Sequence, residues 1–220
     1  SSKSISNRLL IIQTLCKENF MIENLSNSDD TKSLQKALNS TEEIIDVGHA
    51  GTSFRFLTSS LSIQNGNKFI LTGSDRMKER PIKELVKVLR KIGAKIDYME
   101  KEGFPPLKII GTELEGGKVE INGDVSSQFI SSILLIAPTL KNGIELKIKG
   151  KIVSKPYLEM TLKLMQEFGV KWTWEENTIT IKKQDYEAKN YSVESDWSAA
   201  SFWFEIASLS EGCNIKLNGL

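Results

Sequence analysis

The apolar positions along the chain predict two kinds of helix. The first kind is apolar on almost every side, opens with Ser, Thr or Asp, and is normally buried. Four segments fit it, at residues 6–15, 52–63, 126–140 and 198–209. The second kind is amphipathic and occurs at 80–93 and 155–169, where one face is apolar and the other charged. We therefore predict buried helices accompanied by outer, half-exposed ones.

Each amphipathic segment is followed by a predicted β-hairpin. Residues 94–100 and 105–111 are expected to form the first hairpin, and residues 170–176 and 178–183 the second. Runs rich in β-branched and aromatic residues with turn residues between them are typical of such pairs. Together with the helices, the hairpins predict a mixed α/β chain.

The chain repeats one unit. Phe56, Phe129 and Phe202 occupy equivalent positions in three of the buried-type helices, at a spacing of 73 residues. Pro81 and Pro156, which open the two outer helices, are 75 residues apart. This period predicts a βαβαββ unit of strand, buried helix, strand, outer helix and hairpin, used about three times around the buried helices.

Both ends of the chain depart from this repeat. Residues 6–15 resemble an earlier, eroded copy of the buried helix, and residues 198–209 are followed by one predicted strand, 213–219. A buried-type helix without later elements to cover it would expose a large apolar surface. We therefore expect the sequence to be a piece of a longer protein.

Composition limits the classes of partner. The chain has 220 residues, 40% of them apolar, so it is long enough for one large domain or two small ones. Its 29 basic and 28 acidic residues leave a net charge of +1, which predicts no nucleic-acid or membrane partner. The two cysteines, Cys16 and Cys213, have no metal-type spacing, and no apolar run approaches the length of a membrane helix. We expect a cytoplasmic protein in which any basic site is local.

The buried-type helices begin with an unusual number of hydrogen-bond donors. A helix start offers free N–H groups and a partial positive charge, which suit phosphate or carboxylate. The side chains at these starts are Lys3, Ser4, Ser6, Asn7 and Arg8 in one helix, Thr52, Ser53 and Arg55 in the next, and Ser126, Ser127 and Gln128 in the third. Plain N-capping explains any one serine or threonine, but capping has no use for a neighbouring lysine or arginine. Convergence of these starts would make a site for polyanions.

The outer helices begin in the same way. Arg76, Lys78 and Arg80 precede the first outer helix, and Ser154, Lys155 and Tyr157 open the second. Cations beside a positive helix end are unfavourable unless an anion or an acidic residue joins them. Either a bound anion or a solvated basic loop accounts for this pattern.

Other features carry less information. Gly48 and Gly51 frame a tight turn that would let a ligand approach the backbone, although a simple turn explains them equally well. His49 is expected to pack or cap, and Asp29 and Asp30 to serve as an N-cap and a first-turn acid. Walker A, GxGxxG, HExxH and CxxC motifs do not occur, which disfavours nucleotide hydrolases, dinucleotide enzymes and zinc proteases.

Six stretches, taken in order, resemble one enzyme family. They are KSISNR, GHAGTSFRFL, LTGSDRMKERPIKELV, DVSSQFISSILLIAPTL, VSKPYLEMTLKLMQEFGV and VESDWSAAS. Together they resemble the 5-enolpyruvylshikimate-3-phosphate synthases over essentially the whole chain. RMKERPI, and VSSQF followed by VSKPY, are the most specific. The sister family that acts on UDP-N-acetylglucosamine shares the fold and the repeat but lacks this set.

The resemblance implies the enolpyruvyl transferase fold and one domain of a two-domain enzyme. It implies transfer of the enolpyruvyl group of phosphoenolpyruvate to the 5-hydroxyl of shikimate 3-phosphate, in the shikimate pathway to chorismate and the aromatic amino acids. Both substrates are anionic small molecules, as the donor-rich helix starts suggest. No metal and no organic cofactor is expected, and the full-length form is expected to be a monomer.

The resemblance also assigns roles to individual residues. For shikimate 3-phosphate it implies contacts from Lys3, Ser4, Arg8, Ser126, Ser127, Gln128, Ser154 and Tyr157. For phosphoenolpyruvate it implies contacts from Lys3, Gly51, Arg76 and Gln128. Of these, Lys3, Arg76 and Gln128 are expected to take part in catalysis. Thr52, Arg55 and Arg80 are expected to support the site, the two arginines by positioning these groups or by pairing with nearby carboxylates.

The chain departs from the family pattern in two places. The family usually has Asn where this chain has His49 and Pro where it has Phe56, which leaves the shape beside Gly51, and the response to glyphosate, open. The family's acid–base Asp and Glu lie beyond Leu220. The resemblance therefore implies a complete domain at 1–192 and the first piece of a second at 193–220, with negligible turnover by this chain alone. The alternatives are a transferase for UDP-N-acetylglucosamine and a non-catalytic anion-binding module.

Overall fold

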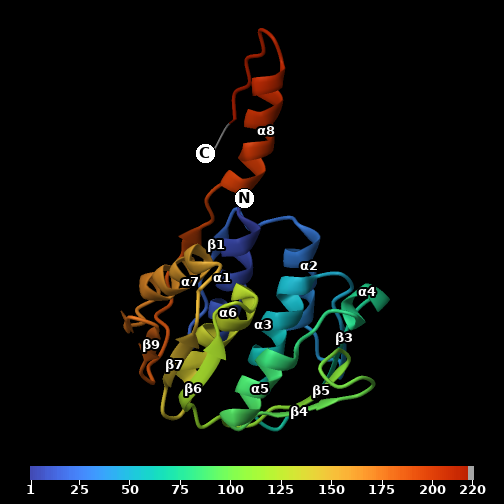
Figure 1. Cartoon of the computed structure of the whole chain (residues 1–220), viewed down its shortest axis with the longest axis vertical. Helices are drawn as coiled ribbons and strands as arrows, with labels where there is room; N and C mark the ends of the chain where they lie inside the picture. The colour runs from blue at the N-terminus through green and yellow to red at the C-terminus, as the bar shows by residue number, and fades with distance from the viewer. Residues whose placement is uncertain (218–220) are drawn as a thin grey trace.

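Two similar four-stranded units form most of the body of the protein. The structure is a computed structural model that describes residues 1–217 (Figure 1). In the first unit the strands run in the order β2-β3-β5-β4, with β2 and β3 parallel and the other neighbours antiparallel. Its elements are β2 (Ile44–Asp46), α3 (Gly51–Ser62), β3 (Lys68–Thr72), α4 (Asp75–Lys78), α5 (Lys83–Lys91), β4 (Lys95–Tyr98) and β5 (Leu107–Ile110).

The second unit repeats the first. Its strands run in the order β6-β7-β9-β8, with the same parallel first pair and antiparallel hairpin. Its elements are β6 (Gly117–Asn122), α6 (Ser127–Ile136), η1 (Ala137–Thr139), β7 (Ile144–Lys149), α7 (Lys155–Glu167), β8 (Trp172–Glu175) and β9 (Thr178–Ile181). The predicted βαβαββ unit and both predicted hairpins are therefore confirmed. Pro156 lies in the first turn of α7, and Gly169, with φ +82°, follows its end.

The third copy is smaller than predicted. It consists of α1 (Lys3–Leu15), β1 (Ile22–Glu23), α2 (Asp29–Leu38) and β10 (Tyr191–Ser192). Within the described residues, its only sheet is the parallel pair of β1 and β10, each two residues long. The backbone N–H of Ser2 donates to the carbonyl of Glu194 at 2.9 Å, so the start of the chain lies beside the segment that follows β10. The third unit is thus assembled from two distant parts of the chain.

The predicted buried helices α1, α3 and α6 lie at the centre of the body. Every residue of α3 is buried, as are Ile5–Ile12 of α1 and Phe129–Ile136 of α6. The helices contact one another at equivalent positions of the repeat. The guanidinium of Arg8 lies over the ring of Phe56 at 5.5 Å, and that of Arg55 lies over the ring of Phe129 at 5.9 Å. Helices α1 and α3 therefore each place an arginine on a phenylalanine of the next buried helix.

Helix α8 (Trp197–Leu209) leaves the body and extends into solvent (Figure 1). Ala200 is its one buried residue, and Trp197, Phe202 and Trp203 are more than half exposed. Its pattern is that of a buried helix, but no described element covers it, so its apolar side chains are exposed, as expected for a buried-type helix without later elements. Of the strand predicted at 213–219, residues 213–217 are not in a strand, and 218 and 219 lie outside the described residues. None of the helices described in residues 1–217 is long and apolar enough to cross a membrane.

Candidate functional site

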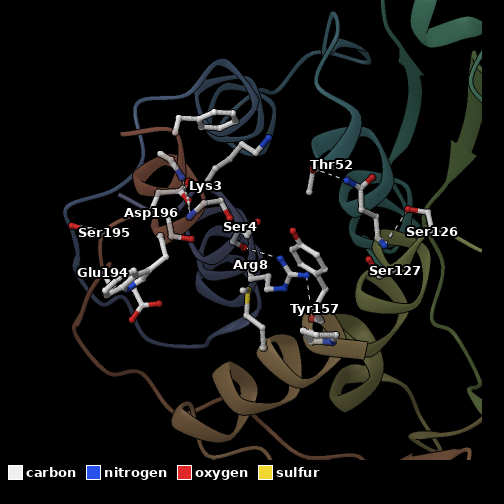
Figure 2. A pocket seen from close by; sticks show the side chains of 18 residues that line it. Lys3, Ser4, Arg8, Thr52, Ser126, Ser127, Tyr157, Glu194, Ser195 and Asp196 are labelled. Atoms are coloured by element: carbon white, nitrogen blue, oxygen red, sulfur yellow. Dashed lines mark hydrogen bonds between the residues drawn. The ribbon is translucent and has the colours of Figure 1, made fainter. Parts of the chain in front are cut away.

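A cavity of about 740 Å³ opens where the first turns of α1, α6 and α7 meet the start of α8. In Figure 2 the labelled residues of α1 lie between the segment 194–196 on one side and Thr52, Ser126 and Ser127 on the other. Of the residues singled out in the sequence, those that line the cavity are Lys3, Ser4, Arg8, Thr52, Ser126, Ser127, Gln128 and Tyr157. Residues separated by more than 150 positions thus share one cavity.

Some of the serines at this cavity are N-caps. The Oγ of Ser126 accepts the backbone N–H of Gln128 at 3.3 Å, and the Oγ of Ser2 accepts that of Ile5 at 3.4 Å. Capping satisfies only part of each helix start, and the first-turn N–H groups retain their partial positive charge. The capping and anion-binding interpretations are therefore compatible for Ser126.

Arg8 is buried beneath the cavity. Its Nε donates to Thr161 Oγ1 at 2.7 Å, and its Nη2 donates to Ser131 Oγ at 3.2 Å. Its Nη1 donates to the carbonyl of Ser4 at 2.8 Å. Burial lowers the pKa of Arg8 to about 10, with Tyr157 acting in the opposite direction, so the guanidinium stays charged at neutral pH. Arg8 therefore ties α1 to α6 and α7 and brings a positive charge to the cavity.

Lys3 is held by an acid on a neighbouring helix. Its Nζ lies 3.1 Å from Asp30 Oδ2, and the other carboxylate oxygen of Asp30 is buried without a partner in the described chain. The sequence predicted for Asp30 only a role in the first turn of α2. It also placed an N-cap at Asp29, whereas Ser28 caps the helix. The ion pair had no local signal, because 27 residues separate its partners.

Gln128 links two of the buried helices across the cavity. Its Nε2 donates to Thr52 Oγ1 at 3.0 Å, which joins the start of α6 to the start of α3. The amide oxygen of Gln128 then remains to accept a hydrogen bond from a ligand. Thr52 directly follows Gly51, and Arg80, which lines a second hollow, lies next to Gly51. The Gln128–Thr52 hydrogen bond therefore lies between the cavity and this second hollow.

The second hollow is a recess of about 380 Å³ lined by His49, Arg76, Met77 and Arg80. The guanidiniums of Arg55 and Arg80 both approach Gly51 so closely that a Cβ there would clash with their Nη1 atoms. Burial and the charge of Arg80 lower the pKa of Arg55 to about 10, and Asp30 opposes them. The two guanidiniums therefore repel each other next to a hollow of molecular size.

Arginine–carboxylate pairing, one of the two roles expected for Arg55 and Arg80, is absent from the described part of the chain. No carboxylate in residues 1–217 forms an ion pair with Arg55, Arg76 or Arg80. Arg55 instead donates from Nη1 to the carbonyl of Gly51 at 2.9 Å, and Arg80 lines the recess itself. Because three arginines lie here and none forms an ion pair within the described residues, the recess is suited to an anion.

Among models of known protein families, the one described as EPSP synthase (3-phosphoshikimate 1-carboxyvinyltransferase) matches residues 33–220 of the chain. The chain belongs to the EPSP synthase family. This confirms the family resemblance of the six sequence stretches.

Several relatives of the EPSP synthase family match the whole chain. The chain is 50% identical to the 3-phosphoshikimate 1-carboxyvinyltransferase of Bacteroides fragilis (strain YCH46), covering 100% of this chain and 54% of that protein. It is 37% identical to the protein of the same name from Vibrio campbellii (strain ATCC BAA-1116), covering 100% of this chain and 58% of that protein. The chain thus spans about half the length of the curated relatives it matches.

A solved structure supports the fold. The EPSP synthase from Acinetobacter baumannii matches 96% of this chain and 52% of its own, with a TM-score of 0.81 at 22% sequence identity. The mixed α/β architecture with its repeated units is therefore that of EPSP synthase structures.

The structure does not bring all the predicted residues into one hollow. Gly51 and Arg76 lie at the recess, whereas the other predicted contacts, except Ser154, line the cavity. Ser154 immediately precedes α7, makes no capping bond, and is not among the cavity-lining residues. Lys155 points elsewhere, since its Nζ lies 5.2 Å from the ring of Trp174. The role expected for Ser154 remains a prediction.

The residues that line one side of the cavity were not predicted from the sequence. Glu194, Asp196, Trp197 and Phe202 line it from the segment that enters α8. Nothing in their local pattern indicated this, because they reach the cavity through the pairing of β1 with β10 and the Ser2–Glu194 hydrogen bond. Thr161 and Ser131, which hold Arg8, carried one weak signal, since both are polar residues in otherwise apolar parts of α7 and α6.

Proposed function

We propose that this chain is part of an enzyme that transfers the enolpyruvyl group of phosphoenolpyruvate to the 5-hydroxyl of shikimate 3-phosphate. The observation that carries the proposal is the pair of adjoining cationic hollows, joined through Gly51, Thr52 and Gln128. A transferase with two anionic substrates needs two anion sites next to each other. The family membership supports the same reaction.

The cavity is proposed to take shikimate 3-phosphate. The hydroxyls of Ser126 and Ser127 and the free N–H groups of α6 suit its phosphate. Arg8 and Ser4 suit its carboxylate, with Tyr157 beside the ring, and Gln128 offers its amide oxygen to a hydroxyl. Ser154 would contact the phosphate at the edge of the cavity.

The recess is proposed to take phosphoenolpyruvate. Arg76 lines it, and the missing side chain of Gly51 leaves room for the guanidiniums of Arg80 and Arg55 beside it. Lys3 lies at the cavity and would exchange its contact with Asp30 for one with a substrate phosphate. In the reaction the 5-hydroxyl adds to the enolpyruvyl double bond, and the tetrahedral intermediate then loses phosphate. Fixed cations favour the departing phosphate.

Turnover by this chain alone is expected to be negligible. General acid–base groups contribute roughly 10²- to 10⁴-fold to such reactions. The resemblance places the acid–base Asp and Glu beyond Leu220. We further propose that the complete enzyme is a cytoplasmic monomer that acts on small anionic molecules.

Calorimetric titration of the 220-residue chain with shikimate 3-phosphate tests the cavity assignment. We expect saturable binding that weakens at least about tenfold in the double variant Ser126→Ala, Ser127→Ala, because hydrogen bonds to a charged group are each worth about 1.5–3 kcal/mol. Ser208→Ala, an exposed serine of α8 outside the cavity, serves as the control and should bind as the unmodified chain does.

Two outcomes would favour the alternatives. If UDP-N-acetylglucosamine bound more tightly than shikimate 3-phosphate, the sister transferase would be the better assignment. If shikimate 3-phosphate bound no better than sulfate, a general anion-binding module would replace the transferase. Measured turnover close to that of full-length relatives would contradict the expectation for the isolated chain.

A further inference from the structure

His49 lies at the rim of the recess and has no role in the reaction proposed above. It is the single histidine of the chain, it is exposed, and it lines the recess together with Arg76 and Arg80. It sits in the loop between β2 and α3, two residues before Gly51. An imidazole is both a hydrogen-bond donor and a group that gains positive charge between about pH 5 and 8.

Ser74 forms a hydrogen bond with one ring nitrogen of His49. The Nδ1 of His49 lies 2.8 Å from Ser74 Oγ, and that oxygen accepts the backbone N–H of Met77 as the N-cap of α4. When the Ser74 hydroxyl is the donor to Nδ1, the proton of the neutral ring is on Nε2. In the charged ring Nδ1 donates to Oγ, and Nε2 is protonated as well. Nε2 therefore carries a donor N–H in this neutral tautomer and in the charged ring.

The charged groups around His49 come from three elements. Asp46 ends β2, and its carboxylate accepts the N–H of Gly48 at 2.8 Å. Arg55 lies on α3 behind Gly51. On α4 and directly after it are Asp75, Arg76, Lys78, Glu79 and Arg80, and Lys78 pairs with Glu100. Of this set, only Arg76 and Arg80 line the recess with His49, so a proton on His49 adds a third positive charge to a cationic hollow.

Proton binding and anion binding at such a recess favour each other. A bound dianion attracts Arg76, Arg80 and the protonated ring of His49, and it accepts the Nε2–H. By linkage, the factor by which the proton strengthens anion binding equals the factor by which the anion strengthens proton binding.

We propose that His49 is an anion-contacting residue of the recess and that it makes the binding of a phosphate-like dianion tighter at acidic than at alkaline pH. The proposal rests on the proposed function only in that the recess takes the anionic group of the second substrate. His49 would thereby set the pH range in which this substrate binds well.

The single histidine allows a direct test by NMR. The Hε1 resonance of His49 is followed from pH 5 to 8.5 in the 220-residue chain, with and without saturating sulfate, at matched ionic strength in chloride. Sulfate is the probe because it stays a dianion over this range, whereas phosphate titrates within it. We expect sulfate to move the titration midpoint up by about 0.7–1 pH unit, which corresponds to about five- to tenfold tighter binding to the protonated form. An unchanged midpoint would overturn the proposal.

Variants at two positions locate the effect. Arg76→Ala removes a cation of the recess without touching His49, and the midpoint should then no longer respond to sulfate. A midpoint that still moved by the full amount in this variant would mean that the anion lies elsewhere, and would overturn the proposal. In His49→Asn, and in His49→Gln as a second neutral replacement, sulfate affinity measured by other recess resonances should lose its pH dependence.

The result is separable from the proposed function. If sulfate moves the His49 midpoint but shikimate 3-phosphate does not bind the cavity, the recess contact stands and the transferase assignment fails. If shikimate 3-phosphate binds while the midpoint stays fixed, the transferase assignment stands and the role of His49 is refuted.

Discussion

At the scale of single residues, Gly51 is the tightest point of the site. A Cβ at this position would clash with the guanidinium nitrogens of both Arg80 and Arg55. Gly51 does not have a positive φ, so alanine would bring no backbone strain. The need for glycine here is therefore a matter of space for two cations.

Gly51→Ala is expected to push the Arg80 guanidinium away from the recess and to weaken sulfate binding there by about tenfold, or about 1.4 kcal/mol. The measurement is a sulfate titration followed by NMR. Gly48→Ala is a matched control, because Gly48 has φ +56° and no neighbour within 4 Å of its would-be Cβ. That variant should lose about 1–2 kcal/mol of stability while keeping sulfate affinity. Equal loss of affinity in both variants would contradict the steric explanation.

At the scale of helices, several serines of α3 and α6 are buried in the core among apolar residues. Ser59 of α3 donates to Ser132 of α6 at 2.9 Å, and the two residues are 73 positions apart, which is the period of the repeat. Ser132 also donates to the carbonyl of Phe129 at 2.9 Å. Small hydroxyl residues thus let the two buried helices approach closely at equivalent positions. The next residue, Ser60, is 1% exposed, and its Oγ has no partner in the described chain.

Adjacent serines of α3 are therefore expected to respond differently to alanine. Ser59→Ala removes an interhelical hydrogen bond and should lower the free energy of unfolding by about 1 kcal/mol. Ser60→Ala removes a buried hydroxyl that bonds to nothing, so it should be neutral or stabilise by up to about 1 kcal/mol. Urea unfolding of both variants measures the difference. A loss of stability in Ser60→Ala as large as that in Ser59→Ala would show that the hydroxyl of Ser60 has a partner in solution.

At the scale of the whole molecule, the segment after β9 is anchored to the buried helix α6. Tyr186 is buried, and its hydroxyl donates to the carbonyl of Leu135 in α6 at 2.8 Å. Burial, and to a smaller extent Cys16, raise the pKa of Tyr186 well above its usual range. Because the folded state holds this proton more tightly than the unfolded state, stability is fully present below about pH 10 and falls as pH rises above it.

Alkaline unfolding measures this contribution. Between pH 10 and 11 the free energy of unfolding should fall by up to about 1.4 kcal/mol through Tyr186 alone. Tyr186→Phe should start about 1 kcal/mol less stable at pH 8, because the hydrogen bond to Leu135 is lost, and should show a shallower decline above pH 10. Cys16, whose pKa burial raises to about 11, is present in both proteins. Parallel curves for the two proteins would contradict the assignment to Tyr186.

The sequence by itself determined the elements and the repeat. The hairpins, the buried helices α3 and α6, the outer helices and the donor-rich helix starts follow from spacings of two to four residues and from N-cap chemistry, which act within a few residues of the chain. The period of 73 residues predicted which positions would be equivalent, and the Ser59–Ser132 contact agrees with it. Family membership also followed from the order of the motifs.

Only the tertiary structure decided what each donor contacts. Arg8 and Arg55 look alike in sequence. The guanidinium of Arg8 nevertheless donates hydrogen bonds to Thr161 and Ser131, whereas that of Arg55 lies beside that of Arg80 at Gly51. Chain-distant packing likewise paired Lys3 with Asp30, reduced the third sheet to β1 and β10, and left the apolar helix α8 exposed. The physical reason is the same in each case. Local spacing specifies the face on which a side chain lies, but its neighbours are set by segments 25 to more than 150 residues away along the chain.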